Sequence, residues 1–292
     1  MIPLNWQNKN GKTTVSKKIP NAKNSIIYNE DKISAYSKLL ERDVAVTILL
    51  PPSFASSPTK FPLLLLNDGQ DMDKLGVKTI IEQLVEEGTM ENLIVAGVVA
   101  GDRLQEYGVT TQQDYLKRGK LTKAYAKYIT TELIPYLLYK YPIDPSARQH
   151  SIAGCSMGGL SAIDLAWNFP DLFQKVGVFS GSFWWRKRDS SSRFYSDHRD
   201  RLMHRQIRNG KLKPGMKFWF QTGKLDEQSD RNKNGIIDSI DDTLDLIAEL
   251  TKKGYRPFYD IQYFEMENGR HNLETWAEAM PEFLKWAFGK TN

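Results

Sequence analysis

One serine in the chain has the neighbours of a catalytic nucleophile. Ser156 is the centre of Gly154-Cys155-Ser156-Met157-Gly158, a Gly-x-Ser-x-Gly pattern that Gly159 extends. The residues before it favour a short strand, and the apolar spacing of residues 160–169 favours a helix. A serine on so tight a strand-to-helix turn has a strained backbone, and the first amides of the helix point at its hydroxyl. The stretch therefore predicts a nucleophile elbow, with Ser156 attacking a carbonyl carbon.

A nucleophilic serine needs a general base, and elimination among the four histidines leaves one. His150 lies on the strand before the serine, and His198 and His204 fall in a polar segment before any suitable acid. His271 follows the last expected strand and precedes the last expected helix. From such a loop an imidazole reaches back to the serine and takes its proton. We therefore expect His271 to be the base.

The third member of a triad is an acid that precedes the histidine in the chain. We expect it directly after a strand over residues 216–222, where Asp226 is our choice and Glu227 the alternate. Its role is to hold the correct tautomer of His271 and to stabilise the imidazolium.

The tetrahedral intermediate also needs two amide donors for its oxyanion. One is expected to be the N–H of Met157, the residue after the serine. The other comes from the loop after a buried strand at residues 61–67, where the N–H of Gln70 is the natural donor.

Strands and helices alternate along the chain around these residues. This order predicts an α/β-hydrolase fold, a mostly parallel central sheet with helices on both faces. Besides the strand before Ser156, the expected strands are 43–50, 61–67, 92–99, 175–180, 216–222 and 258–264. The expected helices are 76–87, 121–139 with a kink near Pro135, 160–169, 243–253 and 273–288.

Length and composition fit one soluble domain. The 292 residues contain no internal repeat, so we expect a single domain, residues 1–292, in which 1–43 form a polar extension with edge strands near 17–20 and 25–28. No apolar run approaches the ~20 residues of a membrane span, and the first residues lack the features of a secretory signal. The net charge of +5 does not by itself indicate nucleic-acid binding, and a single cysteine excludes an internal disulfide. We expect a cytoplasmic protein, with a processed and exported chain as the alternative, that binds neither membrane nor nucleic acid.

These motifs together resemble the Putative esterase family of α/β-hydrolases, which includes esterase D, enterochelin esterases, feruloyl and acetyl-xylan esterases and mycolyltransferases. The resemblance covers roughly residues 40–288. The matching pieces lie at 48–54, 68–71, 106–107, 132–136, 154–159, 169–173, 179–182, 269–272, 276, 281–284 and 286. It implies the fold, the triad and the hydrolysis of an ester or thioester, and it does not choose a substrate. Many members have His-Gly where this chain has Asp68-Gly69 in the oxyanion loop.

Residues 230–241 match the calcium loop of EF-hand and dockerin modules. Such loops have oxygen ligands at positions 1, 3, 5, 9 and 12, a glycine at 6 and a carbonyl ligand at 7. The corresponding residues are Asp230, Asn232, Asn234, Asp238 and Asp241, with Gly235 at the turn and the carbonyl of Ile236. We expect a structural calcium ion here and no cofactor for catalysis. The alternative is a solvated acidic turn.

Residues 183–213 combine aromatic and basic side chains. Ten Lys or Arg and three Asp lie between Arg186 and Lys213, directly after Trp184 and Trp185. Because the segment follows an expected strand end, it can overhang the active site as a lid whose tryptophans contact an aromatic or anionic ester. The alternative is a solvated surface helix with the tryptophans in the core.

Together these residues predict a serine carboxylic-ester hydrolase that works through an acyl-enzyme on a small-molecule ester of the siderophore or acylated-sugar type. Two alternatives stay open. The same residues could transfer the acyl group to an acceptor other than water, or the site could be vestigial in a calcium-binding interaction protein. The complete set of Ser156, His271 and Asp226 favours the enzyme. The sequence gives no indication of the oligomeric state.

Overall fold

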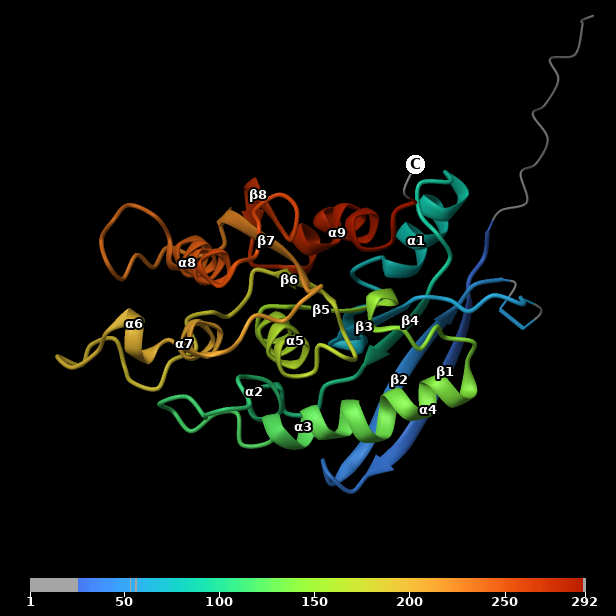
Figure 1. Ribbon diagram of the computed structural model, residues 1–292, viewed down its shortest axis with the longest axis horizontal. Helices are drawn as coiled ribbons and strands as arrows, with labels where there is room; N and C mark the ends of the chain where they lie inside the picture. The colour runs from blue at the N-terminus through green and yellow to red at the C-terminus, as the bar shows by residue number, and fades with distance from the viewer. Residues whose placement is uncertain (1–25, 53, 56, 291–292) are drawn as a thin grey trace, which may run out of the picture.

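Eight strands form a single sheet in the order β1-β2-β4-β3-β5-β6-β7-β8 (Figure 1). The computed structural model describes residues 26–290 except Ser53 and Ser56. β1 and β2 pair antiparallel with each other, β2 also pairs antiparallel with β4, and every other pair is parallel. The strands are β1 (Asn29–Ser37), β2 (Arg42–Leu50), β3 (Leu63–Asn67), β4 (Ile94–Val98), β5 (His150–Cys155), β6 (Lys175–Phe179), β7 (Lys217–Leu225) and β8 (Ile261–Arg270).

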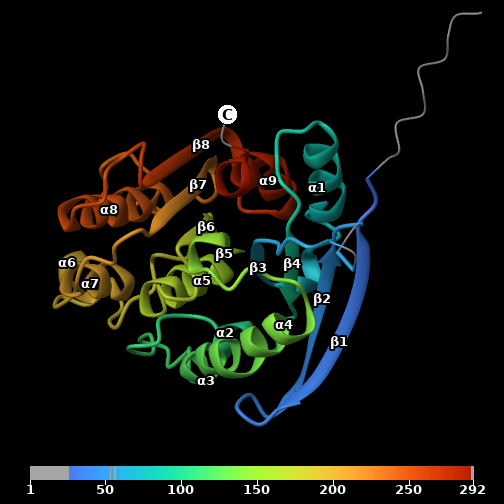
Figure 2. The ribbon, with the colours of Figure 1, turned by 45° about the vertical axis from the view of Figure 1, so that its right-hand side comes forward.

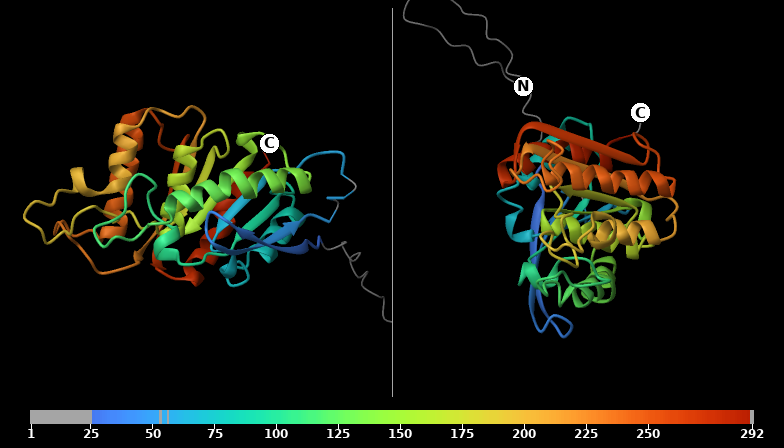
Figure 3. Two further views of the ribbon diagram at one scale, coloured as in Figure 1. Left: turned by 90° about the horizontal axis from the view of Figure 1, so that it is seen from below. Right: turned by 90° about the vertical axis from the view of Figure 1, so that its left-hand side faces the viewer.

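Helices cover both faces of this sheet, which confirms the predicted fold class (Figures 2 and 3). The helices are α1 (Val77–Glu86), α2 (Arg103–Glu106), α3 (Thr122–Tyr128), α4 (Ile134–Lys140), α5 (Met157–Asn168), α6 (Asp197–Asp200), α7 (Leu202–Asn209), α8 (Asp238–Lys253) and α9 (Leu273–Phe288). Three short turns are η1 (Gly69–Asp71), η2 (Ile129–Leu133) and η3 (Ala147–Gln149). Within the described residues, no helix has both the length and the apolar content needed to cross a membrane.

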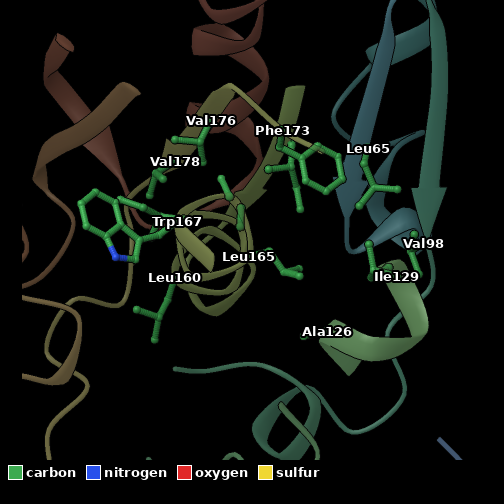
Figure 4. Packing of buried hydrophobic residues seen from close by; sticks show 14 of the residues in the cluster. Leu65, Val98, Ala126, Ile129, Leu160, Leu165, Trp167, Phe173, Val176 and Val178 are labelled. Carbon is green, nitrogen blue, oxygen red and sulfur yellow. The ribbon is translucent and has the colours of Figure 1, made fainter. Parts of the chain in front are cut away.

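Alternate residues of the central strands pack into two separate cores. Leu63 and Leu65 of β3 belong to the core that α3, α5, α7 and α8 cover. Leu64 and Leu66 belong to the core beneath α1 and α9. Figure 4 shows part of the first core, where side chains of α5 meet those of β6 and β3. The continuous apolar runs of the sequence therefore arise because these strands are buried on both faces.

The edge strand differs from the expectation. Residues 26–28 are not part of a strand. The edge strand β1 begins at Asn29, and its mostly polar residues pair with β2 along the whole length of that strand. The strand predicted near 17–20 lies outside the described residues.

Two later elements are longer than predicted. β8 begins at Ile261 and continues to Arg270, since its pairing with β7 extends beyond the last apolar residue of the run. α8 begins at Asp238, five residues before the expected start, with two aspartates in its first turn, where negative charge is favourable. The predicted kink near Pro135 corresponds to a π-turn, η2, directly before α4.

Phe283 provides a test of the core beneath α9. Its ring is fully buried and lies 5.6 Å from the ring of Phe179 and 5.5 Å from that of Trp219, measured between centroids. We expect Phe283→Ala to lower the free energy of unfolding by about 3–5 kcal/mol, because it leaves a cavity. Phe258→Ala, at a ring that is 92 % exposed, should change it by less than about 0.5 kcal/mol. Urea unfolding followed by circular dichroism measures both, and equal losses would contradict this packing.

Candidate active site

Ser156 occupies a strained turn between β5 and α5. Its backbone angles are φ 56° and ψ −120°, which an L-residue rarely adopts. The turn requires close backbone contact, since a Cβ on Gly154 would lie 2.5 Å from the carbonyl carbon of Gly158. The Ser156 N–H donates to the carbonyl of Phe179 at 2.8 Å, which fixes the turn to the neighbouring strand. The serine hydroxyl is therefore held at the end of the sheet, at the N-terminus of α5.

His271 lies within hydrogen-bond distance of this serine. The His271 Nε2 and Ser156 Oγ atoms are 2.9 Å apart. His271 directly follows β8 and precedes Asn272, whose side chain caps α9 by accepting from the Thr275 N–H at 3.1 Å. The two buried histidines, His150 and His204, bond to backbone carbonyls instead. The structure thus brings together the serine and the histidine that the sequence singles out.

The surroundings of His271 favour its neutral form. His271 is exposed to solvent in part, yet the protein atoms around its ring lower its pKa below the usual 6.5. The charge of Asp226 raises this pKa and that of Arg103 lowers it, and both effects are smaller than that of burial. A neutral imidazole is the state that can accept a proton from a serine.

Asp226 lies close enough to influence His271, but no hydrogen bond joins the two side chains in the described part of the chain. Asp226 directly follows β7, and its Oδ2 accepts from the Gly223 N–H at 3.1 Å. Its Oδ1 is buried without a partner among the described residues. Glu227 instead faces α8, where burial and the nearby Asp238 raise its pKa. Of the two acids, Asp226 is the one whose charge acts on the histidine.

The two expected oxyanion donors lie in the first turns of the helices that follow β3 and β5. Gln70 belongs to η1, which follows β3, and Met157 is the first residue of α5. Neither backbone N–H has an acceptor among the residues that the structure describes. The Gln70 side chain is fixed by a bond from its Nε2 to Asp68 Oδ1 at 3.0 Å and by one from the Ala100 N–H to its Oε1 at 3.1 Å.

A buried network that sequence reasoning missed connects these two segments. Asn67, at the end of β3, donates from Nδ2 to the Gly158 carbonyl at 2.7 Å and accepts from the Tyr125 hydroxyl at 2.6 Å. Asp68 has a left-handed backbone, φ 62°, and its carboxylate accepts from Arg103 Nε at 2.7 Å and Nη2 at 3.0 Å. The sequence of the connection between β3 and η1 does not indicate these partners, because they lie far away along the chain.

A pocket of about 230 Å³ opens beside Ser156. Its lining combines apolar side chains, Leu75, Leu273 and Trp276, with the polar Asp68, Asp71 and Arg103. Trp276 is held by a bond from its Nε1 to Ser180 Oγ at 3.0 Å and lies edge-on to His271. The tryptophan at the pocket is therefore Trp276, whose only signal in the sequence is its place in a family motif.

The two tryptophans expected to bind substrate do not line this pocket. Trp185 is fully buried, so it cannot contact a substrate. Trp184 is partly buried, and Arg118 lies over its ring at 5.0 Å.

Part of the expected basic lid, around α7, packs into the body of the protein. In α7, Leu202, Met203 and Ile207 are buried in the core. The buried Arg201 forms ion pairs with Asp242 and Asp245 of α8, and Arg208 pairs with Glu249 at 3.0 Å. This half of the segment packs on the body of the protein, and several of its cations are neutralised there.

The predicted calcium loop makes hydrogen bonds among its own side chains. Asp230 accepts from two backbone amides of the loop, and the amides of Asn232 and Asn234 donate to Asp241 at 2.8 and 3.2 Å. Asp238 forms an ion pair with Arg231 at 3.2 Å. Over the described residues, no three His, Cys, Asp or Glu side chains are grouped so that they could hold a metal ion. Calcium binding stays a prediction from the sequence.

The chain is similar to known proteins over most of its length. The Putative esterase family matches residues 37–287. The uncharacterized protein YbbA of Bacillus subtilis (strain 168) is 22 % identical over 250 residues, 84 % of this chain and 92 % of that protein.

Solved structures of esterases have a similar fold. A ferulic acid esterase has a TM-score of 0.67 and 19 % identity, over 90 % of this chain and 98 % of that chain. The enterobactin esterase FES from Shigella flexneri, solved in the presence of enterobactin, has a TM-score of 0.68 and 18 % identity, over 98 % of this chain and 68 % of that chain. Because the family match spans most of the sequence, from β1 to α9, the chain belongs to the Putative esterase family and is an enzyme of the esterase class.

Proposed function

We propose that the protein is a serine carboxylic-ester hydrolase that works through an acyl-enzyme. The observation that carries the proposal is the 2.9 Å contact between His271 Nε2 and Ser156 Oγ, made by a serine with φ 56° at the start of a helix. A strained serine, a neutral histidine and two amides without an acceptor among the described residues would supply a nucleophile, a base and an oxyanion site.

The reaction follows from this arrangement. Ser156 Oγ attacks the ester carbonyl carbon while its proton passes to His271 Nε2, and the Gln70 and Met157 amides donate to the oxyanion. The C–O bond to the alcohol breaks, and His271 returns the proton to the departing oxygen. Water, deprotonated by His271, then attacks the acyl-enzyme and releases Ser156. Asp226 stabilises the imidazolium, and we expect its carboxylate to form a hydrogen bond to His271 only when substrate is bound, since catalytic hydrogen bonds often tighten only in that complex.

The pocket supports a proposal about the substrate class. A volume of about 230 Å³ with Trp276, Leu75 and Leu273 on its walls suits one compact aromatic or short aliphatic group of a small-molecule ester. The ferulic acid esterase and the enterobactin esterase, which share the fold, are named for aromatic esters. Arg103 at the rim is already paired with Asp68, so the pocket itself places little net positive charge beside an anionic substrate.

Removal of either central side chain tests the reaction. We expect Ser156→Ala and His271→Ala each to lower kcat/KM for a short-chain p-nitrophenyl ester by about 10⁴-fold or more, because the two act as one unit. Matched circular dichroism spectra would show that both variants are folded. Retention of wild-type turnover by folded Ser156→Ala would remove the proposed mechanism.

The acid and the base are tested together by pH dependence. Because His271 must be neutral and its pKa is lowered below 6.5, kcat/KM should fall only as pH drops below that value. Asp226→Asn should lower kcat by about 10³–10⁴-fold. Glu227→Gln is the matched control and should stay within about threefold of wild type, since Glu227 faces α8. A larger loss in Glu227→Gln than in Asp226→Asn would reverse the assignment of the acid.

Calcium binding to residues 230–241 is a separate prediction. In this loop Asp238 would have to exchange Arg231 for the ion, so we expect weak binding, with a dissociation constant of about 10⁻⁴–10⁻³ M. Calcium at a few times this concentration should raise the unfolding temperature, magnesium should not, and Asp230→Ala should abolish the shift. If titration calorimetry detects no heat of calcium binding at these concentrations, the loop is a solvated acidic turn and the prediction is wrong.

A further inference from the structure

A second serine hydroxyl contacts the proposed nucleophile. Ser182 lies three residues after the end of β6, and its Oγ is 3.2 Å from Ser156 Oγ. Its backbone N–H donates to the Ser156 carbonyl, also at 3.2 Å. The side chain is buried, with 2 % of its surface exposed. Ser182 therefore meets Ser156 at two points, one on the backbone and one on the reacting oxygen.

Proton counting fixes the direction of the contact between the hydroxyls. Ser156 has one hydroxyl proton, which points to His271 Nε2 when the histidine acts as the base. In the described structure, Ser156 Oγ is the only partner of Ser182 Oγ. A buried hydroxyl that donates to nothing is costly. The Ser182 proton therefore points to the lone pairs of Ser156 Oγ.

We propose that Ser182 is a catalytic residue that donates a hydrogen bond to Ser156 Oγ and stabilises the negative charge that develops there. This inference rests on the proposed esterase reaction. In acylation, Oγ gains charge as its proton moves to His271, and a hydrogen bond to a charged oxygen is stronger than one to a neutral oxygen. The Ser182 proton stays on Ser182 throughout, so the balance of the reaction is unchanged.

The same bond acts in the second half of the reaction. When water attacks the acyl-enzyme, the bond between the acyl carbon and Ser156 Oγ breaks and its electron pair returns to Oγ. His271 delivers the proton that the oxygen needs, and Ser182 again donates to it while the charge is largest. The proposal therefore predicts slower acylation and slower deacylation without the Ser182 hydroxyl.

The segment that presents Ser182 is fixed on both sides. Ser180 has φ 43°, its N–H donates to the Gln221 carbonyl at 2.8 Å, and its Oγ accepts from Trp276 at 3.0 Å. On the other side the Trp185 N–H donates to the Ser182 carbonyl at 3.2 Å. A donor held in this way needs no reorganisation when charge appears on its partner, which is the condition for electrostatic catalysis.

A variant without the Ser182 hydroxyl distinguishes the proposed catalytic role of the side chain from the structural role of the backbone N–H. Ser182→Ala keeps the backbone bond to the Ser156 carbonyl and loses only the hydroxyl. For p-nitrophenyl acetate in stopped flow, we expect the acylation burst and the steady-state rate each to fall by about 10- to 100-fold, the range for a hydrogen bond to a charged group. KM should change by less than about threefold, because the bond forms to the nucleophile and not to the substrate.

Two further variants keep the test decisive. Ser151→Ala removes another fully buried serine hydroxyl, on β5, that has no partner among the described residues, and it should leave the rates unchanged. Ser182→Thr keeps a hydroxyl and should recover at least a third of the wild-type burst rate if circular dichroism shows it folded. Wild-type rates in Ser182→Ala would overturn the inference, as would equal losses in folded Ser182→Ala and Ser182→Thr.

Failure of this inference is distinguishable from failure of the proposed reaction. If Ser156→Ala loses turnover while Ser182→Ala keeps the wild-type rates, the esterase mechanism stands and the role of Ser182 is wrong. If Ser156→Ala itself keeps turnover, the reaction does not use this serine, and the inference about Ser182 is overturned with it.

Discussion

The site depends on one backbone constraint, the turn that joins β5 to α5 at Ser156. A residue with φ 56° stays in that conformation only if its surroundings hold it there. Here Phe179 of the neighbouring strand accepts the Ser156 N–H, and Ser182 and the first turn of α5 donate to the Ser156 carbonyl. Asn67 donates to the carbonyl of Gly158 in the same turn. The turn presents the hydroxyl and leaves the Met157 N–H without an acceptor in the described part of the chain, so the same constraint would produce both the proposed nucleophile and part of the proposed oxyanion site.

Arginine side chains near this turn and in the layer around α7 are paired with carboxylates. Arg103 is paired with Asp68, and Arg201 and Arg208 are paired with carboxylates of α8, although the chain as a whole has a net charge of +5. His271 is surrounded by enough protein to lower its pKa, while the charge of Asp226 limits that effect. This balance favours the neutral form of His271. In the proposed reaction, the charge that then needs stabilisation is the one that develops on the oxyanion and on Ser156 Oγ.

The sequence predicted what local patterns encode. Ser156 was found from its glycines, and His271 from its place between the last strand and the last helix, and the structure places their side chains in contact. The sheet followed from apolar runs. Arg103 had no signal, and Ser182 appeared only within the family piece at 179–182, because their contacts join residues 35 and 26 positions apart. The sequence also does not indicate that Trp185 is buried, or that α7 is buried within a strongly polar segment. Both depend on packing against distant parts of the chain, which the periodicity of one sequence does not reveal.

The central claim is that Ser156 forms a covalent intermediate. Its most direct test is to react the native protein with a fluorophosphonate and map the modified peptide by mass spectrometry. The account predicts one equivalent of label on Ser156, prevented by prior acidification, which protonates His271. Absence of label in folded protein at pH 7, or a label on another residue, would contradict the account.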